Sequence, residues 1–126
     1  MRRSDQRRAA VVAHYQHDVT GRSLDDLVER EATAFTRELI DGVARAEPEL
    51  DALIERYSEG WTLDRIAPLE RNILRVALYE MLHRGDVPDE VAIDEAIESA
   101  KELCSAEAPG FINGILGAVH RERANA

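Results

Sequence analysis

Four arginines lie within the first eight residues of this chain: Arg2, Arg3, Arg7 and Arg8. The amino end of a helix carries partial positive charge and favours acids, so basic side chains there indicate an external anion. Guanidinium groups form paired hydrogen bonds with phosphate, and the ring of Tyr15 offers a surface for an unpaired base. We therefore predict a binding edge for single-stranded RNA, the alternative being a frayed, solvated terminus.

Two other groups of polar residues resemble catalytic or metal sites. Arg75, Glu80 and Glu95 could act as acid and base, but no nucleophile, metal-ligand set or glycine-rich phosphate loop accompanies them. We expect them to form a charge-assisted network between two helices. His14 and His17 are too few for a zinc site, which generally needs four ligands. The sequence predicts a binding protein without cofactor or metal, and no enzyme.

The charge of the chain restricts where a nucleic acid could bind. The net charge is −9, and the basic first residues leave the remainder more acidic still. Because nucleic-acid affinity comes largely from neutralising phosphates, an acidic body would confine RNA to the basic edge and let a basic protein dock elsewhere. Cys104 is the only cysteine, which excludes an internal disulfide. With no apolar run long enough for a membrane span, we expect a cytoplasmic protein.

Helical spacing of apolar residues dominates, and no segment alternates as a half-buried strand would, so we expect an all-α fold. Ser4 is expected to cap a first helix that ends at Gly21, with an apolar face formed by Val11, Val12, Tyr15 and Val19. Ser23 should begin a second helix. A third, beginning near Phe35, should break at Glu47-Pro48, and a fourth should end near Tyr57.

The second part of the chain predicts three long helices. Thr62 should cap a short helix beside a packed Trp61, and Pro68 should begin a helix that is apolar nearly all round and therefore central. Further helices should follow Pro88 and Pro109-Gly110. We predict one domain over residues 1–126, a compact bundle of about seven helices in two fused three-helix subdomains, about 4–58 and 62–123.

The central segment resembles a known family. Residues 67–81, APLERNILRVALYEM, are similar to the "ER-x-ILR-x-A-x-YE" core of NusB-type transcription antitermination factors. Residues 87–96, VPDEVAIDEA, the pair Ala100-Lys101 and residues 111–116, FINGIL, follow in that family's order. The opening arginines with Ala13-His14-Tyr15 also resemble the family's "R-x-x-A-x-x-x-LY" start, with His14 in place of leucine.

The resemblance implies a factor that binds boxA-type RNA jointly with NusE, a small-subunit ribosomal protein, in antitermination complexes on rRNA transcripts. It places Arg3, Arg7, Arg8 and Tyr15, with Arg2, at the RNA edge. A second wall would lie at the start of the last helix, where Glu107, Phe111 and Asn113 are expected. Core packing is the alternative for Phe111. Glu70 is expected to face NusE, or to lie on a solvated surface.

A different class of function remains open. The acidic body and His14 also suit a protein-interaction adaptor, or a homodimer that lacks specific RNA binding. Recovery of NusE without preference for boxA over a scrambled RNA would favour this alternative.

Overall fold

The computed structural model describes all of residues 1–126 and contains only helices. In chain order they are α1 (Arg3–Thr20), α2 (Leu24–Leu27), α3 (Ala34–Tyr57), the 3-10 helix η1 (Leu63–Arg65), α4 (Pro68–His83), α5 (Asp89–Leu103) and α6 (Ala108–Ala124). The all-α prediction is confirmed. None of the helices combines the length and the apolar character that crossing a membrane requires.

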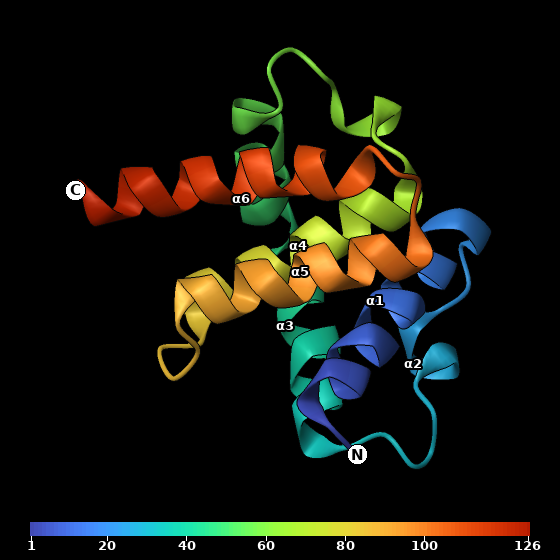
Figure 1. Ribbon diagram of the computed structural model, residues 1–126. Helices are drawn as coiled ribbons and strands as arrows, with labels where there is room; N and C mark the ends of the chain where they lie inside the picture. The colour runs from blue at the N-terminus through green and yellow to red at the C-terminus, as the bar shows by residue number, and fades with distance from the viewer.

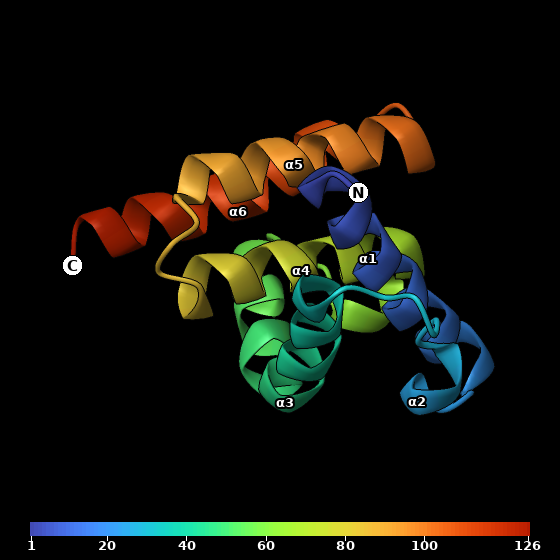
Figure 2. The same cartoon turned by 90° about the horizontal axis from the view of Figure 1, so that it is seen from below.

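Helix α4 occupies the centre of the molecule. Figures 1 and 2 show α5 and α6 covering one side of α4, while α1 and α3 pack against the other side. Every residue from Asn72 to Met81 is buried, as a helix that is apolar nearly all round requires. The two predicted chain halves therefore meet around α4 in one shared core.

The predicted break at Glu47-Pro48 is wrong, because α3 continues through Pro48 to Tyr57. A proline within a helix cannot donate a hydrogen bond to the carbonyl four residues earlier, here that of Ala44. Both Pro48 and Ala44 lie on the exposed face, where water can serve that carbonyl. Apolar side chains on both sides of the proline, such as Val43 and Leu50, are fully buried and hold the two halves in line. The two predicted helices are thus one, which leaves six α-helices instead of about seven.

The buried face of α1 also differs from the prediction. Val12 and Val19 are 40% and 48% exposed, and the buried stripe instead contains Arg7, Ala10, Val11, Ala13 and His14. Ser4 lies inside α1, where its hydroxyl donates to Glu95, and so does not cap the helix. The expected end is confirmed, because Gly21 adopts the left-handed conformation at φ 74°. The helix is thus rotated so that two polar residues, Arg7 and His14, face the interior.

Candidate nucleic-acid interface

Arg7, predicted to contact RNA, is buried and bound inside the protein. Its Nε donates to both carboxylate oxygens of Glu80 in α4, at 2.8 and 3.0 Å. Its Nη1 lies 3.7 Å from Glu95 in α5, and only 8% of the Arg7 side chain is exposed. Arg7 is spaced from Ala10, Val11 and His14 as residues on one face of a helix are, and this spacing is a signal in the sequence for its burial. Arg7 therefore joins α1, α4 and α5 from a buried position, and its Nε is committed to Glu80.

The predicted network of Arg75, Glu80 and Glu95 is two separate networks. Glu80 and Glu95 meet through Arg7, as described above. Arg75 instead binds Asp51 through Nε and Nη2 at 2.7 and 3.1 Å, and contacts Asp18 at 3.2 Å and Glu47 at 3.2 Å. Although burial opposes its charge, the hydrogen bond and charge of Asp51 raise the pKa of Arg75. Both networks join helices, which is the structural role that was expected of these residues.

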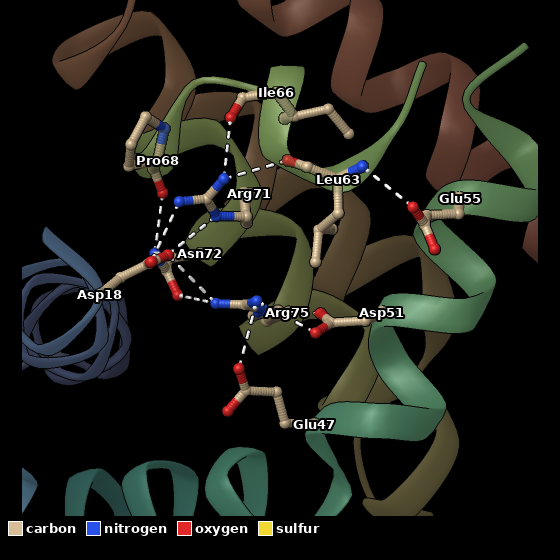
Figure 3. Close-up of polar contacts among 10 residues, drawn as sticks. All are labelled: Asp18, Glu47, Asp51, Glu55, Leu63, Ile66, Pro68, Arg71, Asn72 and Arg75. Carbon is tan, nitrogen blue, oxygen red and sulfur yellow. Dashed lines mark hydrogen bonds and ion pairs between the residues drawn. The ribbon is translucent and has the colours of Figure 1, made fainter. Parts of the chain in front are cut away.

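Asp18 of α1 is the centre of the second network (Figure 3). It accepts hydrogen bonds from Arg71 at 2.8 and 3.0 Å and from Asn72 at 2.9 Å. Burial alone would raise the pKa of Asp18, but the hydrogen bonds from Arg71 and Asn72 outweigh it and lower the pKa. Arg71 also reaches the carbonyls of Leu63 and Ile66, at 3.0 and 3.2 Å. The network thereby connects α1 and α4 to the η1 segment.

The other predicted arginines lie closer to solvent. Arg2 is exposed and lies 3.5 Å from Asp5, while the exposed Arg3 stacks over the ring of Phe35 at 4.1 Å. Arg8 is 21% exposed and its Nη1 lies 2.7 Å from Glu102 in the last turns of α5. Each of these arginines thus has an acidic or aromatic neighbour. At Arg8 the neighbour is acidic, so an RNA phosphate there would compete with the carboxylate of Glu102. Tyr15 is half-buried in α1.

An aromatic pocket lies where η1, α4 and α6 meet. It is lined by Trp61, Arg65, Ile66, Ala67, Glu70, Glu107 and Phe111. Trp61 is 51% exposed, so the prediction that it is a packing anchor is wrong; it ends the turn after α3 and contributes its side chain to the surface. Phe111 is half-buried beside it, and the exposed Asn113 lies two residues further along α6 and does not line this pocket. Of the residues that line this pocket, Phe111 and Glu107 were predicted for the RNA site, whereas Trp61 and Arg65 were not.

Carboxylates border this pocket. Burial raises the pKa of Glu70, and the nearby charge of Glu107 adds to the effect. Burial likewise raises the pKa of the Cys104 thiol, with a further contribution from Glu70. The charge of Glu70 is therefore felt by two groups near the α5–α6 connection, Cys104 and Glu107. That connection begins next to Glu102, the residue that Arg8 contacts. Through the contact of Arg8 with Glu102, α1 meets the end of α5, where the connection to α6 begins, whereas the N-terminal end of α1 lies at the bottom of Figure 1, away from α6.

The two histidines are engaged separately. His14 is buried, and its Nε2 lies 2.9 Å from the carbonyl oxygen of Ile40. His17 Nδ1 lies 2.6 Å from the carbonyl of Arg22. Each imidazole thus has its own backbone partner, and no group of three or more histidine, cysteine and acidic side chains is arranged to hold a metal ion.

An exposed tryptophan, a neighbouring phenylalanine and nearby arginines can stack on flat rings and bind phosphates. A sequence profile of the NusB family matches residues 4–121. The chain belongs to the NusB family. Among NusB relatives, the transcription antitermination protein NusB of Rubrobacter xylanophilus is 43% identical over 122 residues, which cover 92% of this chain and 88% of the relative. That of Frankia casuarinae is 54% identical over 85 residues, which cover 68% of this chain and 63% of the relative's length.

Solved NusB structures share the whole arrangement. The structure of T. maritima NusB superimposes with a TM-score of 0.87 at 35% identity, covering 97% of this chain and 92% of that one. A chain in the crystal structure of antitermination factors NusB and NusE in complex with dsRNA gives a TM-score of 0.84 at 23% identity, covering 95% and 96%. The latter likeness concerns the fold alone.

Proposed function

We propose that this NusB-family chain is a transcription antitermination factor that binds boxA-type RNA together with NusE and supports rRNA transcription in the cytoplasm. The observation that carries the RNA part is the exposed Trp61 beside Phe111, in a pocket at the start of α6. The ring of a half-exposed tryptophan beside a phenylalanine gives an unpaired base a surface on which to stack. The family match and the antitermination relatives support a binding factor over an enzyme.

The RNA surface that we propose runs from the α1 edge to the aromatic pocket. Arg2, Arg3 and Arg8 would bind phosphates, Tyr15 would add a stacking surface, and Trp61 with Phe111 would hold an unpaired base. Arg65 adds a positive charge at the rim of the pocket. We assign Arg7 the task of fixing α1 through Glu80, in place of RNA contact. Asn113 and Glu107 remain proposed contacts at the second wall, where Glu107 also weakens binding by repulsion.

The protein partner that we propose is NusE. A solved chain of the same fold comes from a complex of NusB, NusE and RNA. The acidic body of the present chain, with a net charge of −9, complements a basic ribosomal protein. Glu70 is our candidate contact, since it lies beside the RNA pocket and remains half-exposed. Binding through Glu70 would let NusE and RNA contact each other across that rim, as part of a transcription elongation complex.

An adaptor or homodimer without specific RNA binding remains the second candidate. It is favoured by the acids that already pair with the edge arginines, because the contacts of Arg8 with Glu102 and of Arg2 with Asp5 reduce the charge available to RNA.

Titration of labelled boxA-type and scrambled RNA with the full-length chain, with and without NusE, tests the proposal. We expect tighter binding to boxA and a further gain with NusE. Trp61→Ala should weaken boxA binding by about 1–3 kcal/mol, the value of one base–aromatic stack. The control is Val91→Ala, a 42% exposed apolar residue in the first turn of α5. Equal affinity for boxA and scrambled RNA, with NusE still bound, would establish the adaptor instead; light scattering in parallel gives the oligomeric state.

A further inference from the structure

Trp61 has to be held on a segment with little regular structure. Between α3 and α4 the chain forms only a turn at Glu59-Gly60, where both residues have positive φ, and the short η1. Trp61 itself is fixed on one side by Ser58, whose hydroxyl donates to the Trp61 carbonyl at 2.6 Å. Trp61 is 51% exposed, so packing of the indole restrains it only in part. The segment that follows, Thr62–Ala67, must supply the remaining restraint.

Two side chains from the long helices fix that following segment. Glu55 of α3 accepts a hydrogen bond from the backbone nitrogen of Leu63 at 3.1 Å. Arg71 of α4 donates from Nη1 to the carbonyls of Leu63 and Ile66, at 3.0 and 3.2 Å. Figure 3 shows Arg71 reaching these carbonyls on one side and Asp18 on the other. Arg71 thereby contacts both ends of η1.

Only an arginine can make all of these contacts at once. Nε and Nη2 of Arg71 bind the two carboxylate oxygens of Asp18, at 2.8 and 3.0 Å, while Nη1 remains for the backbone. The planar guanidinium has five donors in a fixed fork, whereas a lysine has one nitrogen at the end of a flexible chain. The Arg71 side chain is only 12% exposed, so water competes little for these bonds. Asp18 therefore fixes the orientation of Arg71, and Arg71 fixes η1.

We propose that Arg71 is a positioning residue for RNA binding: held by Asp18 of α1, it fixes the η1 segment so that Trp61 stands beside Phe111. The inference rests on the proposed RNA-binding function and adds to it the link between the two walls. Asp18 lies three residues after Tyr15 on the same helix, so the ion pair sets the position of the aromatic pocket relative to the α1 edge. Arg71 itself does not touch the RNA.

The sole tryptophan of the chain makes the proposal measurable without RNA. In full-length Arg71→Lys and Asp18→Asn, we expect lower Trp61 fluorescence anisotropy and stronger acrylamide quenching than in the unaltered protein. The matched control is Asp51→Asn, which removes a partner of Arg75 from the same network but touches no atom of η1. It should lower stability and leave the Trp61 signals unchanged. Circular dichroism and urea unfolding identify conditions in which every variant is folded.

The second experiment measures the affinity of the same variants for boxA-type RNA. Arg71→Lys should weaken binding about fivefold, the lower limit for loss of one base–aromatic stack. Added to Trp61→Ala, it should weaken binding no further, because its effect passes through Trp61; a purely destabilising change would add. Unchanged Trp61 signals in Arg71→Lys would overturn the proposal, as would loosened Trp61 with undiminished RNA affinity. If the unaltered chain binds no RNA, the proposed function fails, while the fluorescence comparison still decides whether Arg71 fixes Trp61.

Discussion

Arg7 of α1 and Glu80 of α4, 73 residues apart in the chain, form a two-oxygen ion pair in the interior, with 8% and 1% of their side chains exposed. Both side chains are buried, and Arg7 is the cation that compensates Glu80, while Arg7 itself also lies 3.7 Å from Glu95. Among the arginines at the start of α1, Arg7 therefore holds the helix in place, while the others remain near the surface.

Arg7→Ala should therefore act on stability. Removing one partner of a buried ion pair leaves an uncompensated charge, here that of Glu80, at a cost of about 3–5 kcal/mol. Urea unfolding followed by circular dichroism measures this cost. A loss below about 1 kcal/mol would show that Glu80 finds solvent or another partner.

Arg8→Ala should act on RNA binding. Its partner Glu102 is 57% exposed, so loss of the pair should change stability by less than about 1 kcal/mol. Loss of a phosphate contact should instead lower RNA affinity and reduce the slope of affinity against salt by about one unit. RNA titration at several salt concentrations measures both effects. An unchanged slope would remove Arg8 from the RNA surface.

Gly42→Ala should destabilise the contact between α3 and α4. A Cβ at Gly42 would lie 2.1 Å from the Cζ atom of Tyr79, far inside van der Waals contact, so the ring or the helix must move. Overpacking of this kind costs about 1–3 kcal/mol. Thermal and urea unfolding measure the change.

Gly114→Ala in α6 is the matched control, because nothing lies within 4 Å of a Cβ at that position. Alanine favours a helix over glycine by about 1 kcal/mol, so this variant should be at least as stable as the unaltered chain. Equal losses at Gly42 and Gly114 would contradict the close approach of Tyr79.

His14 should make the protein less stable in mild acid. Burial lowers the pKa of His14 below its ordinary 6.5, and the charge of Arg75 also lowers it, although the hydrogen bond with the Ile40 carbonyl opposes both effects. Below pH 6.5 the unfolded chain binds a proton at this site more readily than the folded protein does. Stability should therefore fall as pH decreases from 6.5 toward the folded pKa, by at most about 1.4 kcal/mol per pH unit, with no contribution above 6.5.

Urea unfolding between about pH 5 and 8, the range in which histidine titrates, measures how stability depends on pH. His14→Leu should flatten it across the same range. The exposed His83, which pairs with Glu49 at the surface, provides the control variant His83→Gln. If His14→Leu keeps the full slope, another group is responsible.

Glu70→Gln should stabilise the protein and at the same time weaken its binding to NusE. The pKa of Glu70 is raised by burial and by Glu107, so the folded protein holds a proton there more tightly than the unfolded chain. Protonated Glu70 therefore contributes to the free energy of unfolding at low pH, and this contribution is lost as the pH rises through the pKa that Glu70 has in the folded protein. At pH 7 the neutral amide should raise Tm while weakening NusE binding, measured by calorimetry and pull-down.

Glu98→Gln, at an exposed position on α5, is the control for Glu70→Gln and should change neither quantity. A lower Tm for Glu70→Gln would show that its charge is compensated in the folded state. Unchanged NusE binding would remove Glu70 from the proposed interface.

The amino-acid sequence by itself determined the helical class, the ends of most helices and the central position of α4. Apolar spacing and glycine or proline stops depend on neighbours within a few residues, so Gly21, Pro68 and the buried run of α4 could be predicted locally. Local rules failed at Pro48, because distant packing on Val43 and Leu50 outweighs a missing hydrogen bond.

Only the tertiary structure decided which polar side chains face inward. Arg7 and Arg8 are adjacent and chemically identical, yet Glu80 binds the first in the core while the second stays near the surface. Likewise an isolated tryptophan suggested a core residue, but the η1 segment that Arg71 fixes places Trp61 at the surface beside Phe111. In both cases the deciding partner lies in another helix, and an interaction between residues that are distant in the chain leaves no periodic signal near either of them.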